Sequence, residues 1–483
     1  MKSSFAGILS DLSAAQASKL TAKLPSWAAA GVSVPTTLSL EQCSSEPTAL
    51  YKARLARSIM AAGTIGGRET RANIALSFSE HGSPLPPEST VADEHVAGSS
   101  AAAGSQKTRT MFARGRLLPA LWTVADLTGG LGVDSWAFSQ VAGRVIYNEL
   151  SPDLARQASE NFRILGCDNI TVMNHSAEEA LDQIRQSAEL KPGPEESDTK
   201  EEHARLLIYL DPDRRAATGA KMVRLEDCRP NLIELLPRLL DSAPYILVKL
   251  SPMLDITQML WRLSGCVSGI WILSTHRECR ELIVLISRNI STLAATATAT
   301  VITVAEVHPD GTADELHFEA EARPSGQTAP NRSVTNPAGI PLTAAIPEPG
   351  TYIFEPGAAL MKSGCFAQLC SRYNLSQLDT STRLFVCNKQ GNQEYSSEPI
   401  PELEPFGRFR RVSSIRPLSG KTLKELGKEY PRCEITAKNI PMTTDQVRDR
   451  MGSAPGGDVH IYATSILGRR SVVICTASAQ QLR

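Results

Sequence analysis

The feature that most constrains the fold is the stretch VADLTGGLGVDSWAFS, residues 124–139. An apolar run ends in Asp126, a loop with three glycines follows, and an apolar, helix-compatible segment comes next. Glycine lets the backbone turn sharply and approach a ligand, and a helix N-terminus adds free N–H groups. The pattern G-G-x-G departs from the G-x-G-x-x-G of dinucleotide-binding domains. The stretch therefore predicts a strand, a glycine turn and a helix, which form either an ordinary connection or a cofactor loop.

Apolar strands and helices alternate along the chain after this stretch. We expect strands within 143–150, 205–216 and 243–255, two more within 269–288, and helices at 151–166 and 229–240. Residues 169–181 should form a further strand, a polar turn and another helix. Strands that are buried on both faces and alternate with helices are typical of parallel sheets. We therefore predict a Rossmann-like, doubly wound α/β sheet whose last two strands form an antiparallel hairpin at its edge.

The composition excludes several classes of protein. A chain of 483 residues should form two to four domains, and its net charge of −1 gives no global field for nucleic acid or membranes. No stretch approaches the roughly 20 apolar residues of a membrane helix, and the N-terminus does not resemble a signal peptide. The ten cysteines are scattered without C-x-x-C pairs or histidine clusters. We therefore expect a cytoplasmic protein with reduced thiols, no metal site and no membrane partner.

Polar residues and glycines follow four of the predicted strands. In an open parallel sheet, ligands bind at the carboxyl ends of strands, near the switch in strand order. The candidates are Asp126, Thr128, Gly129, Gly130 and Gly132 after the first strand, Glu149 after the second, Ser176, Ala177 and Glu178 after the third, and Asp211 and Pro212 after the fourth. Glu149 lies about 20 residues beyond the loop, where an acid can accept hydrogen bonds from both ribose hydroxyls of a nucleotide.

This order resembles class I S-adenosylmethionine-dependent methyltransferases over residues 112–288. The resemblance implies that S-adenosyl-L-methionine is the cofactor, with its amino-acid portion at the glycine loop and its ribose at Glu149. Glu178 or its neighbours would border the adenine, and Asp211 would face the substrate beside the methyl group. Each acid also has a local interpretation. Asp126 would cap the loop amides, Glu149 would be a solvated charge, Glu178 an early-helix acid, and Asp211 part of a plain turn.

The residues around Asp211 indicate which kind of atom accepts the methyl group. Enzymes of this fold that methylate exocyclic amines usually carry Asp/Asn-Pro-Pro-aromatic after the fourth strand, whereas this chain has Asp211-Pro212-Asp213-Arg214. No cysteine nucleophile follows the fourth or fifth strand, which disfavours methylation of pyrimidine carbon 5. In-line transfer of the methyl group to a nitrogen or an oxygen remains, with Asp211 either orienting the acceptor or acting as a base.

Three further cations could contact the substrate in this region. Arg214 and Arg215 are either surface charges or contacts to a substrate or phosphate. The aliphatic part of the Lys249 side chain either packs at the end of the sheet, or its ammonium contacts the substrate.

Several motifs are distributed along most of the chain. They are PSWAAAGV, LEQCSSEPTALYKA, DLTGGLGVDS, YLDPDRRA, VKLSPMLD, YIFEPGAALMKSG and the tail from Gly407. These motifs are similar to those of bacterial methyltransferases with a THUMP-like C-terminal domain, found in Bacteroidetes. THUMP domains in better-known relatives bind RNA, so the resemblance implies an rRNA or tRNA substrate. Arg408, Arg410 and Arg411 could hold phosphates while interleaved aromatic rings stack on bases, or they form an ordinary solvated face.

The resemblance implies four parts. These are a helical region with a linker at 1–108, a methyltransferase domain at 109–289, a ferredoxin-like α+β domain at 290–402 and a THUMP-like domain at 403–483. The first part either caps the next domain or sends Gln42, Ser44, Ser45 and Glu46 into the cofactor pocket. We predict an RNA methyltransferase. The alternatives are a methyltransferase of protein or small molecules, a binding protein without catalysis, and a nucleotide-dependent dehydrogenase.

Overall fold

The computed structural model describes residues 14–32, 34, 37–64, 122–189, 205–214, 225–263, 265–287, 300–320, 339–388 and 395–477. Residues 82–108, where the linker of the first part is expected, lie outside these residues. The chain divides into two compact units. The first comprises residues 1–275 with 280–327, and the second comprises residues 276–279 with 328–483.

The first unit contains a nine-stranded sheet in the order β11-β10-β8-β9-β7-β4-β1-β2-β3. Strands β3, β2, β1, β4 and β7 are parallel, which confirms the predicted doubly wound core. The strand order reverses at β1, which has β2 on one side and β4 on the other. The strands are β1 (Thr123–Asp126), β2 (Arg144–Asn148), β3 (Ile170–Met173), β4 (Leu206–Leu210), β7 (Tyr245–Leu250), β8 (Val267–Thr275), β9 (Glu278–Ser287), β10 (Thr300–Val307) and β11 (Ala313–Ala320).

The far half of this sheet differs from the prediction. Strands β8 and β9 are the two expected strands, but β9 lies between β8 and β7 and runs antiparallel to β7. They do not form the edge of the sheet, because β10 pairs with β8 in parallel and β11 pairs with β10. The expected domain boundary at residue 290 is therefore wrong for these two strands, which extend the sheet of the first unit.

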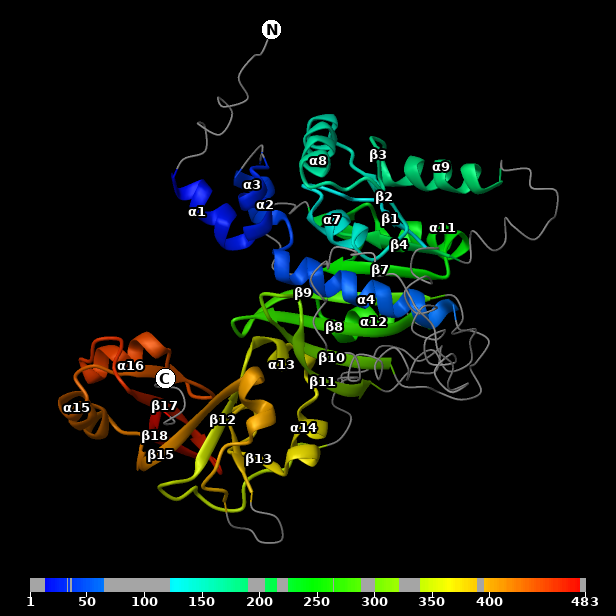
Figure 1. The fold of residues 1–483 in the computed structure, drawn as a ribbon. Helices are drawn as coiled ribbons and strands as arrows, with labels where there is room; N and C mark the ends of the chain where they lie inside the picture. The colour runs from blue at the N-terminus through cyan, green and yellow to red at the C-terminus, as the bar shows by residue number, and fades with distance from the viewer. Residues whose placement is uncertain are drawn as a thin grey trace, which may run out of the picture. The chain divides into compact units, whose positions relative to one another are not determined.

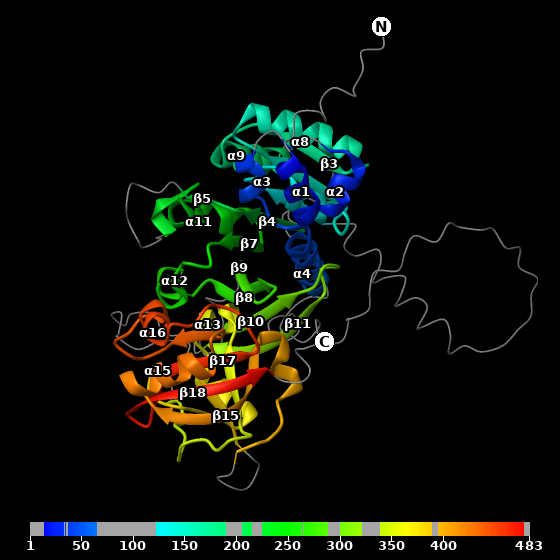
Figure 2. The ribbon, with the colours of Figure 1, turned by 90° about the vertical axis from the view of Figure 1, so that its left-hand side faces the viewer.

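Helices cover both faces of the nine-stranded sheet. Figure 2 shows α4 on one side of β4, β7 and β9, with α11 and α12 on the other. Helices α4, α7 and α8 share one apolar core with alternate residues of β1, β2 and β4. The helices of this unit are α1 (Ala14–Lys23), α2 (Pro25–Ala30), α3 (Thr37–Gln42), α4 (Glu46–Thr64), α7 (Val133–Ser139), α8 (Pro152–Ile164), α9 (Ala177–Glu189), α11 (Leu232–Ser242) and α12 (Ile256–Arg262).

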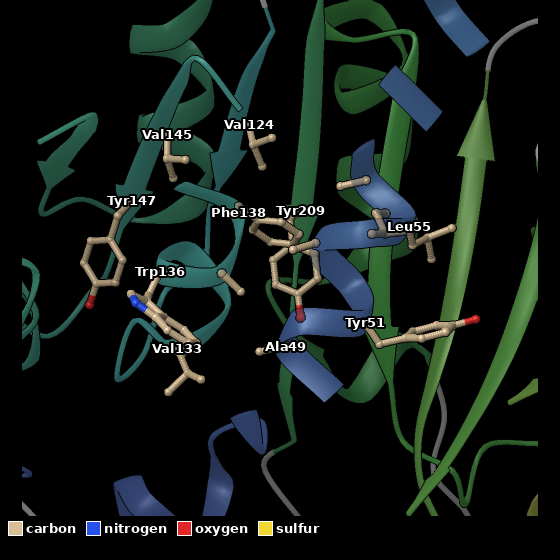
Figure 3. Close-up of a cluster of buried hydrophobic side chains, with 14 of the residues drawn as sticks. Ala49, Tyr51, Leu55, Val124, Val133, Trp136, Phe138, Val145, Tyr147 and Tyr209 are labelled. Atoms are coloured by element: carbon tan, nitrogen blue, oxygen red, sulfur yellow. The ribbon is translucent and has the colours of Figure 1, made fainter. Parts of the chain in front are cut away.

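Helix α4 connects the N-terminal region to this core. Its buried positions Ala49, Ala53, Ala56 and Met60 recur at three- and four-residue spacing, as expected for one face of a helix. Figure 3 shows the core beside this helix, where Phe138 of α7 and Tyr209 of β4 lie side by side between α7 and α4. Their ring centroids are 5.0 Å apart. The N-terminal helices are therefore part of the first unit.

The second unit contains a seven-stranded sheet in the order β13-β14-β12-β15-β18-β17-β16. Figure 1 shows this unit, with α15 and α16 near β17 and β18. Leu423 and Leu426 of α15 and Val447 of α16 form one apolar cluster against this sheet, and a second cluster includes Ile353 and Val473. The elements are β12 (Tyr352–Pro356), α13 (Ala358–Ser363), α14 (Phe366–Tyr373), β13 (Leu375–Gln377), β14 (Phe385–Cys387), η5 (Pro401–Phe406), β15 (Gly407–Pro417), α15 (Gly420–Glu429), β16 (Glu434–Ala437), α16 (Thr444–Met451), β17 (Val459–Ile466) and β18 (Arg469–Ala477).

Three global features concern the described residues alone. No helix among them is long and apolar enough to cross a membrane. They contain no group of three or more His, Cys, Asp or Glu side chains placed to hold a metal ion. No disulfide joins any of the ten cysteines, all of which lie in the described ranges.

Candidate functional site

The glycine loop joins the end of β1 to the start of α7, as predicted. A Cβ atom on Gly129 would lie 2.2 Å from the Tyr147 ring, so this position excludes every larger residue. Gly132 has a φ of 90° and lies against Phe162. Gly130 has a φ of 54°, and nothing lies within 4 Å of where its Cβ would be. The loop is therefore close-packed against β2 and α8 and open at Gly130, where a ligand can approach the backbone.

Glu149 lies directly beside this loop. It follows β2, and its two carboxylate oxygens accept hydrogen bonds from the N–H groups of Gly130, at 2.9 Å, and Ser151, at 2.8 Å. The side chain is only partly buried. Each carboxylate oxygen has a second lone pair, so the group can still accept hydrogen bonds from a ligand.

Asp126 takes part in the internal bonding of the loop. Its carboxylate accepts hydrogen bonds from the Thr128 N–H, at 3.1 Å, and the Ser135 hydroxyl, at 2.7 Å. This is the capping role that the sequence left open, and contact with a cofactor stays a prediction. Burial raises the pKa of the Asp126 carboxyl to about 7, against the effect of the Ser135 hydrogen bond.

We expect Asp126→Asn to change how stability depends on pH. Because the folded pKa of Asp126 lies above its unfolded value of about 3.9, the folded state loses stability as pH rises between these two values. Urea unfolding should show the variant gaining about 2–3 kcal/mol relative to wild type between about pH 5 and about pH 8. Asp153→Asn, on the exposed surface of α8, is the control and should follow wild type. Parallel curves for Asp126→Asn and wild type would contradict the raised pKa.

The residues after β3 also lie at this edge of the sheet. Ser176 caps α9, since its hydroxyl accepts the Glu179 N–H at 3.2 Å while its own N–H donates to the Glu179 carboxylate. Ala177 is buried, and Glu178 is exposed in the first turn of the helix. Asn148, which the sequence analysis missed, connects this segment to the glycine loop. Its amide donates to the carbonyl oxygens of Leu127 and His175, and a polar residue inside an apolar strand was the available signal.

Asp211 and Lys249 form an ion pair at the ends of the adjacent strands β4 and β7. The Asp211 N–H donates to the Thr128 hydroxyl at 2.6 Å, which joins this end of β4 to the glycine loop. Burial acts to lower the pKa of the Lys249 ammonium, but Asp211, Glu281 and Asp134 outweigh it and raise that pKa. The sequence placed both residues at strand ends, and the structure brings their charges into direct contact.

The remaining residues after β4 are placed only in part. Pro212 is buried, and Arg214 belongs to β5 (Asp213–Arg214), which pairs with β6 (Cys228–Arg229) beyond the 3-10 turn η3 (Leu225–Asp227). Arg215 lies outside the described residues. The proposed substrate contacts of these two arginines therefore stay predictions.

A buried ionic cluster lies beside the site and was not predicted. The Lys52 ammonium of α4 is completely buried, and lies 2.8 Å from carboxylate oxygens of both Asp134, in α7, and Glu281, in β9. Burial alone would raise the pKa of Asp134, but Lys52 and Lys249 hold it below its usual value. The sequence signal was a lysine on the apolar face of α4, at the spacing of Ala49 and Ala56. We call these three residues the Lys52 cluster.

The Lys52 cluster includes hydrogen bonds from the segment before α4. Ser44 accepts a hydrogen bond from Lys52 at 2.6 Å and donates to Asp134 at 2.8 Å. The Glu46 carboxylate instead accepts a hydrogen bond from the Ser26 N–H within the N-terminal helices, and Gln42 is exposed. Of the N-terminal candidates, Ser44 contacts the helix that follows the glycine loop.

The three arginines of β15 differ in their surroundings. Arg408 and Arg411 are exposed, whereas Arg410 is buried and its Nε donates to the Tyr462 hydroxyl at 2.9 Å. Tyr462 donates in turn to Glu355, which also pairs with Lys438 at 2.8 Å. The prediction that Arg410 contacts substrate is corrected here, because its burial removes it from the surface.

Comparisons with known proteins agree with this architecture. Residues 352–392 match the family model of a ferredoxin-like domain, and residues 407–477 match a THUMP domain-like model. In this chain both segments share one sheet, because β12 pairs with β15. No curated protein matches the chain significantly.

Among solved structures, a "putative methyltransferase from Porphyromonas gingivalis W83" is similar over 96% of this chain and 88% of its own, with 24% identity and a TM-score of 0.66. An rRNA methylase from Streptococcus thermophilus matches over 39% of this chain and 99% of its own, with 10% identity and a TM-score of 0.24. An RNA methyltransferase from Salinibacter ruber, in complex with S-adenosyl-L-homocysteine, matches over 39% of this chain and 93% of its own, with 13% identity and a TM-score of 0.20. The chain therefore has the fold of the Porphyromonas structure, with a Rossmann-like sheet followed by segments that match ferredoxin-like and THUMP-like domains.

Proposed function

We propose that this protein is an S-adenosyl-L-methionine-dependent methyltransferase that acts on RNA. The observation that carries the proposal is the hydrogen-bonded convergence of three strand ends. Glu149 after β2 accepts from the backbone of Gly130, and Thr128 in the same loop accepts from the backbone of Asp211 after β4. This edge of the sheet lies where the strand order reverses, which is where open α/β sheets bind ligands.

The residues at this edge fit the proposed cofactor. Gly130 leaves open space beside the loop backbone, and Glu149 presents a carboxylate suited to two ribose hydroxyls. When bound, S-adenosyl-L-methionine supplies an electrophilic methyl group on a sulfonium sulfur. The residues proposed to hold it are Asp126, Thr128, Gly129, Gly130, Gly132, Glu149, Ser176, Ala177 and Glu178, with Asp211 facing the substrate.

The second unit supports RNA as the substrate. The segment at 407–477 matches a THUMP-like model, and THUMP domains in better-known relatives bind RNA. Arg408 and Arg411 in β15 are exposed, and guanidinium groups can pair with phosphates through two hydrogen bonds. We propose these two arginines as phosphate contacts.

We expect the double variant Arg408→Ala/Arg411→Ala to bind RNA about tenfold more weakly at physiological salt. Each arginine that pairs with a phosphate releases a counterion from the RNA, and this favourable contribution to binding is lost in the variant. Gel shifts with total RNA over a range of salt concentrations should give a shallower slope than wild type. S-adenosyl-L-methionine affinity should stay unchanged. Arg156→Ala/Arg163→Ala, which removes two exposed arginines of α8, is the matched control.

The test of the activity itself is transfer of a labelled methyl group to RNA from a strain that lacks this protein. RNA of that origin carries the unmodified target, so the label should enter RNA and not protein. Label in protein or in small molecules would assign a different substrate class. Absence of S-adenosyl-L-methionine binding would overturn the whole proposal.

A further inference from the structure

The Asp211–Lys249 pair combines a carboxylate and a permanently charged ammonium at the position proposed to face the substrate. The Asp211 side chain is about one-third exposed, at 33%, and the Lys249 side chain is 12% exposed. Besides Asp211, the acids Glu281 and Asp134 act on Lys249, and the cations Lys52 and Lys23 lie in the same region. The pair is therefore a charged group that an incoming substrate can reach.

We propose that the methyl acceptor is a hydroxyl oxygen, the ribose 2′-hydroxyl of an RNA, with Asp211 taking its proton and Lys249 stabilising the charge on the oxygen. The inference rests on the proposed function, since it names the acceptor atom of that same site.

The ammonium group distinguishes oxygen from nitrogen as the acceptor. A neutral nitrogen that attacks a methyl sulfonium takes on positive charge, which an adjacent ammonium opposes. A hydroxyl oxygen that gives up its proton develops negative charge, which the same ammonium stabilises. A carboxylate alone would serve either acceptor, so Lys249 is the residue that favours the oxygen.

The pKa shifts of the pair are consistent with this division of roles. The pKa of Lys249 is raised, because Asp211, Glu281 and Asp134 outweigh the effect of its burial, so its ammonium keeps its proton. Burial raises the pKa of the Asp211 carboxyl, although Lys249 opposes that shift. Asp211 is therefore the proton acceptor of the two.

The chain after Asp211 gives a second, independent argument. An aromatic ring placed after the Asp-Pro step would stack on a base whose amine is methylated. Here the next two residues are Asp213 and Arg214, which form strand β5 and pair with β6. The described residues of this turn, 211–214, therefore include no aromatic ring that could stack on a base.

The proposed step balances in atoms and charge. The 2′-O–H proton moves to the Asp211 carboxylate, and an oxygen lone pair forms a bond to the methyl carbon. The electrons of the carbon–sulfur bond pass to sulfur, which becomes neutral. The products are a 2′-O-methyl ribose, S-adenosylhomocysteine and a proton that Asp211 releases to water.

The location of the transferred label tests this inference. RNA from a strain lacking the protein is labelled in vitro with the wild-type enzyme and hydrolysed in alkali, which cleaves only beside free 2′-hydroxyl groups. We expect the label in alkali-resistant dinucleotides. Label in mononucleotides with a methylated base would overturn the inference and leave the proposed function intact. No label in RNA would overturn both.

Variants of Lys249 test the role of the charge. Lys249→Met should lower transfer about 100-fold with an unchanged dissociation constant for S-adenosyl-L-methionine, whereas Lys249→Arg should restore part of the rate. Lys19→Met, which breaks an exposed ion pair with Glu41, is the matched control and should transfer like wild type. If Lys249→Met binds cofactor normally and transfers as fast as wild type, the oxygen assignment is wrong.

Discussion

Replacing Glu149 by alanine is expected to weaken S-adenosyl-L-methionine binding at least 100-fold, because the variant loses hydrogen bonds to a charged acceptor at two ribose hydroxyls. The same change leaves the N–H groups of Gly130 and Ser151 without their present acceptor, which adds to the loss. Calorimetric titration measures the dissociation constant. Glu160→Ala on α8, which removes an exposed acid paired with Arg163, should bind like wild type.

A ligand that lacks one ribose hydroxyl separates direct contact from loop disruption. Wild type should bind the 2′-deoxy form of S-adenosylhomocysteine about tenfold more weakly than the normal form. The Glu149→Ala variant should bind both forms equally, because the acceptor is already absent, and this defines a double-mutant cycle. An equal loss for the deoxy ligand in both proteins would show that Glu149 does not contact the ribose.

Lys52→Met should lower the free energy of unfolding by about 3–5 kcal/mol, because it leaves two buried carboxylates without their cation. Asp134 and Glu281 both lie 2.8 Å from the ammonium, and all three side chains are almost fully buried. Urea unfolding measures the change. Lys19→Met is the matched control, since Lys19 pairs with Glu41 at 2.9 Å and both side chains are 56% exposed. That variant should lose at most about 1 kcal/mol.

A triple variant identifies the cause of this loss. Lys52→Met with Asp134→Asn and Glu281→Gln removes all three charges and should recover part of the stability lost by Lys52→Met alone. A Lys52→Met effect no larger than that of Lys19→Met would show that the cluster contributes little. Because Asp134 lies in the first turn of α7, directly after the glycine loop, the single variant should also weaken cofactor binding.

The local features of the site could be predicted from the sequence because they depend on neighbours in the chain. Gly129, Gly130 and Gly132 follow an apolar run, so a glycine turn between a strand and a helix was predictable, and the structure has it. Asp211 comes directly after an apolar run, and Glu149 after a run that ends in Asn148; each lies at the carboxyl end of a parallel strand. Their roles toward cofactor and substrate stay proposals.

The contacts between distant segments could not be predicted in this way. The sequence placed Lys249 at the end of a strand but did not identify Asp211 as its partner, which lies 38 residues away. Lys52 carried a signal, a charge on an apolar helix face, but its partners lie in α7 and β9. Arg410 looked like its neighbours Arg408 and Arg411, and only the pairing of β15 within its sheet explains its burial.

The sequence by itself determined the strands, the glycine turn, the capped helices and the acids at strand ends, because hydrophobic period, glycine conformation and capping act within a few residues. Only the tertiary structure decided that β9 lies between β7 and β8, that β10 and β11 extend the first sheet, and that α4 brings Lys52 to Asp134 and Glu281. This strand order and these contacts depend on which apolar faces pack against one another between segments far apart in the chain. Local sequence patterns do not specify that packing.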